Sequence, residues 1–172
     1  MFNTGPFFIP KGAPGAIHQH PTAAQSATLL PLLKQVHALH VAAHPDIYAP
    51  ITDDTAITTW FAAHCDATGT KILTAQDGDQ IIGFAILKLS PQHTHTPLHH
   101  PQRTGVIDLI CVHSDHQRRG VAGRLMTHAQ TLAIDAGATE LTASVAAFNT
   151  PSAHLMAQCG LRPLTTRLRK AL

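Results

Sequence analysis

The sequence predicts an α/β fold of the mixed α+β type, in which a central twisted mixed β-sheet carries helices on both faces. Three observations support this prediction. A buried strand runs into an amphipathic helix between residues 106 and 138, an Asp-Gly pair marks a β-hairpin, and helices, hairpin and strand–helix units follow one another. With 172 residues and 44% hydrophobic content, the chain can form one domain with a substantial core.

Residues 1–15 contain too many glycines and prolines for a regular element, so we predict a flexible N-terminal tail. The alternative is that the apolar side chains of this segment dock on the domain. Residues 16–172 then form a single domain. Its first element is a short edge strand at residues 16–20, which Pro21 ends.

The first helix is clearly indicated after Pro31, where apolar residues recur at helical spacing, and Pro45 ends it. Tyr48 follows in the next loop and is the only tyrosine of the chain. We leave two interpretations of Tyr48 open, a lid over an acceptor or an ordinary packing residue.

A second helix is expected from an aspartate cap, Asp53 or Asp54, to about Ala67. Its aromatic residues Trp60 and Phe61 are expected in the core rather than in a site. Two strands follow at residues 71–75 and 80–89. Asp77-Gly78 between them is a strong hairpin signal.

The stretch of residues 90–104 is rich in proline and histidine and has no periodicity, so we expect a loop. A histidine-rich metal-binding protein is therefore one possible function class. No cysteine or carboxylate is near enough in the sequence to complete a ligand shell, and we predict no metal. The histidines concerned are His93, His95, His99 and His100.

Residues 106–112 are almost all apolar, which is typical of a strand buried on both faces. From Gly120 the apolar period becomes helical, and Gly137 ends this helix because glycine readily adopts a left-handed backbone. The turn between them combines small residues with three arginines. Free amides at a helix start, close backbone approach and guanidinium groups together favour a phosphate site.

Gln117-x-x-Gly120-x-Ala122 resembles the Q/R-x-x-G-x-G/A signature of the GNAT family of N-acetyltransferases. The preceding strand that ends in Val112, with its short polar turn, resembles the family pattern as well. This resemblance implies an acetyl-CoA cosubstrate, whose pyrophosphate lies on the turn and whose pantetheine arm pairs with the strand backbone. The implied residues are Gln117, Arg118, Arg119, Gly120, Val121, Ala122, Gly123 and Arg124 on the turn, and Ile110, Cys111 and Val112 on the strand.

Residues 139–146 alternate between apolar and polar side chains, which predicts a half-buried strand. Asn149 then begins a helix, with Pro151 at a permitted early position, and Gly160 ends it. Residues 161–172 are expected to supply a last strand and a solvated basic end.

The spacing of Asn149 and Gly160 resembles the closing N-x-x-A-x-x-x-Y-x-x-x-G-F motif of the same family, with Asn149 among the cofactor-binding positions. Ser152 replaces the alanine and Met156 replaces the tyrosine. In the family this tyrosine is the usual acid for the leaving thiolate, and a thioether donates no proton. Cys159 or water are the alternatives.

Asp108 is the one ionisable residue inside the strand of residues 106–112, on the predicted face of Ile110 and Val112. Desolvation there would raise its pKa and suit it to act as the catalytic base. The alternative, an ion pair with an arginine, is equally open.

The sequence therefore predicts an acetyl-CoA-dependent N-acetyltransferase that acts on a primary amine by direct attack on the thioester. The alternative is an acyl-CoA-binding regulator or sensor of the same fold with little or no catalysis. A net charge of +2 argues against a nucleic-acid-binding surface, and no segment has the length of a membrane span. Three widely spaced cysteines and the lack of a signal peptide favour the cytoplasm. A homodimer is compatible with the predicted acetyltransferase.

Overall fold

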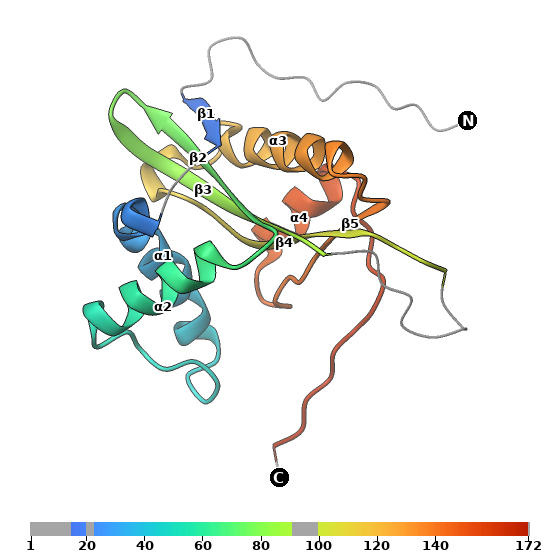
Figure 1. The fold of residues 1–172 in the computed structure, drawn as a ribbon. Helices are drawn as coiled ribbons and strands as arrows, with labels where there is room; N and C mark the ends of the chain where they lie inside the picture. Colours follow the sequence, from blue (N-terminus) through green and yellow to red (C-terminus); the bar gives the residue numbers. More distant parts are fainter. Residues whose placement is uncertain (1–14, 20–22, 91–99, 172) are drawn as a thin grey trace.

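The computed structural model describes residues 15–19, 23–90 and 100–171. A mixed five-stranded sheet with the order β1-β2-β3-β4-β5 lies at its centre (Figure 1). The first three pairings are antiparallel and β4–β5 is parallel. The strands are β1 (Ala16–Gln19), β2 (Thr70–Asp77), β3 (Gln80–Leu89), β4 (Thr104–Val112) and β5 (Glu140–Ala143).

Helices cover both faces of the sheet, as predicted. One face packs against α3 and α4, and the other against α1 and α2. The alternation within β3 shows the division, because Ala85 contributes to the first cluster and Phe84 to the second, and both are fully buried. The helices are α1 (Ala23–Ala43), α2 (Asp54–Asp66), the short 3-10 turn η1 (Ser114–His116), α3 (Val121–Asp135) and α4 (Thr150–Gln158).

The hairpin and the edge strand are confirmed. Gly78 lies in the β2–β3 turn with a left-handed φ of 57°, which explains the Asp-Gly signal. Among the described strands, β1 pairs only with β2, so it forms one edge of the sheet. Apart from Gly15, the predicted tail at residues 1–15 lies outside the described residues.

Helix α1 continues through Pro31. Leu29, Leu32 and Leu33 on either side of the proline are buried against the sheet, whereas Pro31 is exposed. Packing of the leucines therefore outweighs the missing N–H of one exposed residue.

The predicted last strand is wrong for residues 161–171, which form no regular element. Leu164 and Leu168 are 83% and 88% exposed, so this segment places no apolar face on the sheet. The strand predicted for residues 139–146 is shorter and ends at Ala143. Among the described residues, no helix is both long and apolar enough to cross a bilayer.

Candidate functional site

The loop before α3 has two left-handed residues close together. Gly120, the N-cap residue of α3, has a φ of 78°, and Arg118 has a φ of 58°. A left-handed conformation costs a non-glycine residue roughly 1–2 kcal/mol, and such strain concentrates at functional sites. Turns of this kind direct successive N–H groups into one concavity, which suits an anion.

The first turn of α3 carries no side-chain cap. By contrast, Asp53 caps α2 by accepting from the N–H groups of Thr55 and Ala56, both at 2.9 Å. Asn149 caps α4 by accepting from the N–H of Ser152 at 3.1 Å. Within the described chain, the first amides of α3 and its dipole are thus left for an external anion.

The predicted cofactor-binding residues of the turn divide into a buried and an outer set. Val121 and Gly123 are buried against the sheet, and Ala122 and Arg124 are half-buried. A Cβ added at Gly120 would meet no atom within 4 Å, so only its backbone conformation requires glycine and the space before the turn is open. The exposed set is Gln117, Arg118, Arg119 and Gly120.

Half of one edge of β4 has no strand partner in the described structure. β5 pairs with β4 only up to Ile107, whereas β3 continues to Val112. The N–H of His113 donates to the carbonyl of Ile82 on β3 at 2.8 Å. Because N–H directions alternate along a strand, the N–H groups of Val112 and Ile110 point toward the open edge.

Cys111, between these two residues, faces the other way into the core. It is 6% exposed, and its Sγ donates to the carbonyl of Leu32 at 3.3 Å. Burial raises the pKa of the Cys111 thiol to about 12. Its side chain therefore stays a neutral thiol, and only its backbone belongs to the candidate cofactor strand.

Gln35 of α1 holds the end of β4 in place, and the sequence analysis missed it. Its Nε2 donates to the carbonyl of Val112 at 2.9 Å, and its Oε1 accepts from the N–H of Ser114 at 3.2 Å. Gln117 also donates to the Val112 carbonyl, at 3.2 Å. A lone glutamine among the apolar positions of a helix was the available signal.

Asp108 differs from the prediction in three respects. Its side chain is 29% exposed, it pairs with Lys88 at 3.1 Å rather than with an arginine, and it also contacts Nε2 of His64 on α2 at 2.6 Å. It therefore faces α2, not the α3 side occupied by Ile110 and Val112. The cause is a register shift against β3, which leaves Asp108 without a partner and changes the alternation.

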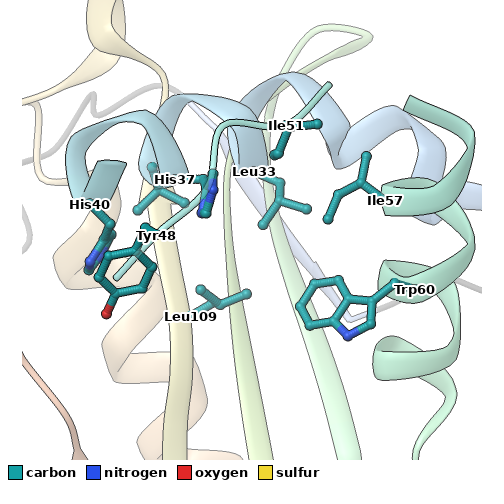
Figure 2. Close-up of a pocket in the computed structure, with 9 residues that line it drawn as sticks. Leu33, His37, His40, Tyr48, Ile51, Ile57, Trp60 and Leu109 are labelled. Atoms are coloured by element: carbon teal, nitrogen blue, oxygen red, sulfur yellow. The ribbon is translucent and has the colours of Figure 1, made fainter. Parts of the chain in front are cut away.

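A cavity of about 360 Å³ lies between α1, α2, the loop joining them and β4, and Leu109, which follows Asp108 in the chain, lines it (Figure 2). We call it the α1–α2 pocket. Trp60 is 52% exposed and forms one wall, so the prediction that it belongs to the core is wrong, whereas Phe61 is fully buried as expected. The lining residues are Leu33, Val36, His37, His40, Tyr48, Ile51, Ile57, Trp60 and Leu109.

Tyr48 lines the pocket and also packs. Its ring lies 5.1 Å from the ring of His40, between centroids, and 6.1 Å from that of His37. In Figure 2 it stands at the opposite end of the pocket from Trp60. The loop after α1 thus supplies a wall of the pocket through a residue held by the helix.

Met156 is 6% exposed and packs with the α3 side of the core. Cys159 of the same segment is half-buried, and burial raises the pKa of its thiol. Among the described residues, no three potential metal ligands lie together. His93, His95 and His99 lie outside the described residues, and His100 is exposed.

Solved structures share this architecture. The tetramutant of the BH1408 protein from Bacillus halodurans has a TM-score of 0.81 at 19% identity, over 91% of this chain and 99% of that chain. The aminoglycoside N-acetyltransferase AAC(6')-Iy in complex with CoA has a TM-score of 0.71 at 19% identity, over 96% and 99%. A ribosomal-protein-alanine N-acetyltransferase from Brucella melitensis biovar Abortus has a TM-score of 0.68 at 18% identity, over 91% and 99%. These likenesses show the fold.

No curated protein matches the sequence. The sequence model of one family, described as the acetyltransferase (GNAT) family, matches residues 33–161. This range is well over half of the chain and contains β4, the turn before α3 and the start of α4. The open strand edge and the uncapped helix start both lie within it. The chain therefore belongs to the acetyltransferase (GNAT) family.

Proposed function

We propose that this protein transfers an acetyl group from acetyl-CoA to a primary amine by direct attack of the amine on the thioester. Membership of the family supports acetyl transfer in general, and one solved structure of the same fold holds CoA. The observation that carries the proposal is the meeting of two unsatisfied backbone features, the uncapped start of α3 and the open edge of β4.

These features fit the cosubstrate residue by residue. The amides of α3 and the exposed side chains of Arg118 and Arg119 suit a pyrophosphate. The open edge suits an extended arm with amide groups, as a pantetheine has. Along this edge, the N–H groups of Ile110 and Val112 would donate to a carbonyl oxygen that gains negative charge during attack. Asn149 stays a proposed contact, with its Oδ1 engaged in capping α4.

The acceptor approaches from the α1–α2 pocket, on the other side of β4. Asp108 there can hold an ammonium group and, together with His64 at 2.6 Å, take up the proton that the amine must lose. The amine nitrogen then forms the bond to the carbonyl carbon, the carbon–sulfur bond breaks, and the leaving thiolate takes a proton from water. Met156 takes no part in this proton transfer.

The second candidate function is acyl-CoA binding without efficient catalysis. One observation favours it: Met156 is a buried thioether at the position of the family's usual acid.

Calorimetry with acetyl-CoA tests the cofactor site through two variants of Gly120. Gly120→Ala brings only backbone strain, because its Cβ has open space, and should weaken binding slightly. Gly120→Glu places a carboxylate where the phosphate would lie and should abolish binding. Equal affinity of the two variants would refute this placement. Release of free thiol from acetyl-CoA across an amine panel separates the enzyme from the non-catalytic alternative.

A further inference from the structure

The α1–α2 pocket is lined mainly by apolar side chains. None of its nine lining residues is acidic, and most are aliphatic or aromatic. The carboxylate of Asp108 belongs to the residue before the lining residue Leu109, and it already contacts Lys88 at 3.1 Å and His64 at 2.6 Å. A ligand that fills the pocket therefore meets apolar walls over most of its surface, and the adjoining carboxylate is reached through Leu109 and Trp60.

Trp60 connects the apolar wall to that carboxylate. Its indole stacks on the ring of His64, with centroids 5.1 Å apart and planes 24° apart, and His64 contacts Asp108 at 2.6 Å. The indole is 52% exposed, and Ile47 nearby on the rim of the loop is 48% exposed. Covering exposed apolar surface of this kind is favourable, and indole is well suited to contact another ring.

From these features we propose that the acceptor is a small arylalkylamine, a single primary amine on an aromatic or similarly apolar body. This inference rests on the proposed acetyl transfer and specifies its acceptor. The body lies in the α1–α2 pocket against Trp60 and Leu109, and the amine points to Asp108. The volume of about 360 Å³ is near the lower end of small-molecule sites, which fits a compact ligand.

The same features disfavour acceptors with many charges. An aminoglycoside or a polyamine carries several ammonium groups, and each would need a carboxylate or water in place of the apolar wall. The other carboxylates in or next to the loop are engaged as well, because Asp53 caps α2 through Oδ1, Asp46 pairs with Arg169, and Asp54 pairs with Lys34. Because Asp108 also pairs with Lys88 at 3.1 Å, these carboxylates offer little compensation for an acceptor with several ammonium groups.

Binding can be measured without turnover, because Trp60 is the only tryptophan of the chain. Titration of the full protein, saturated with CoA, with 2-phenylethylamine should shift its tryptophan emission in a saturable manner. Ethylamine, which keeps the amine but lacks the ring, should not do so at the same concentrations. Absence of any shift with 2-phenylethylamine would overturn the proposal.

Turnover gives the second readout. The kcat/KM for 2-phenylethylamine should exceed that for ethylamine by about 10- to 100-fold, the ratio expected from burying one ring. Trp60→Ala should lower the value for 2-phenylethylamine about tenfold or more and leave acetyl-CoA affinity unchanged. Ile134→Ala, which also removes an exposed apolar side chain (62% exposed) but on α3, is the matched control and should change neither value.

The outcomes separate the two proposals. If kanamycin, spermidine or a peptide N-terminus is acetylated with a higher kcat/KM than 2-phenylethylamine, the acceptor class is wrong and acetyl transfer stands. If 2-phenylethylamine shifts the emission but no amine is acetylated, the pocket assignment stands and the proposed transfer fails. Equal use of 2-phenylethylamine by the wild type and Trp60→Ala would overturn the placement of the ring.

Discussion

Replacing Gln35 with leucine should loosen the junction between α1 and the end of β4. The side chain makes three hydrogen bonds there: Nε2 donates to the Val112 carbonyl at 2.9 Å and to Cys111 Sγ at 3.5 Å, and Oε1 accepts from the Ser114 N–H at 3.2 Å. Leucine makes no hydrogen bond and is about as good a helix former as glutamine, so the substitution removes the bonds and keeps the helix propensity. The Val112 carbonyl keeps its bond from Gln117 at 3.2 Å.

The size of the effect follows mainly from the two bonds to backbone groups, because the bond to Cys111 Sγ is long and weak. A net contribution of about 1 kcal/mol each gives about 2 kcal/mol, and the remaining bond to the Val112 carbonyl reduces the expected loss to about 1–2 kcal/mol. For a chain of this length, 1 kcal/mol corresponds to about 2–4 °C in Tm. The expected fall in Tm is therefore about 2–8 °C.

Differential scanning calorimetry on Gln35→Leu measures this fall directly. Gln130→Leu makes the same chemical change at an exposed position of α3 and should leave Tm within about 1 °C of the wild type. If the two variants unfold at the same temperature, the hydrogen bonds of Gln35 at the end of β4 contribute nothing to stability. The positioning role argued for it would then be wrong.

Two further predictions concern Met156 and His40. Met156→Tyr should raise kcat modestly at unchanged acetyl-CoA affinity, because a phenol supplies the missing acid and general acid catalysis is worth up to about 10²–10⁴-fold. Met156→Phe adds the ring without the hydroxyl and should not raise kcat. If kcat is unchanged in both variants and Asp108→Asn removes activity, the proposed effect of a phenol at position 156 is wrong. Burial, with the neighbouring His37 and His44, lowers the pKa of His40 below 6.5, so its stability contribution is present above pH 6.5 and is lost as pH falls toward the folded-state pKa. Tm should therefore fall less in His40→Asn than in the wild type between about pH 7.5 and 5.5, and equal falls would contradict this.

The central elements of the fold were predictable because their signals are local. The apolar strand before Gly120, the helical stripe after it and the turn at Gly78 each depend on a few adjacent residues. The continuation of α1 through Pro31 was not predictable in this way. It depends on burial of the leucines on either side, and this packing involves residues of the sheet that are distant in sequence.

The candidate site was less predictable for a related reason. The direction of Asp108 depends on a register shift against β3, and strict alternation places it on the wrong face. Trp60 and Phe61 are adjacent and both aromatic, yet one is 52% exposed and the other fully buried. Their rotational positions on α2 decide this difference, and composition carries no information about it.

The early end of the β4–β5 ladder also affects how the protein behaves in concentrated solution. In the described structure, the second half of β4 directs the N–H groups of Ile110 and Val112 to its open edge, and such an edge can pair with an extended chain, including a second molecule. A pantetheine arm along this edge would occupy the same groups. Adding CoA during purification and concentration should therefore suppress self-association, and depletion of the cofactor should promote aggregation before unfolding begins.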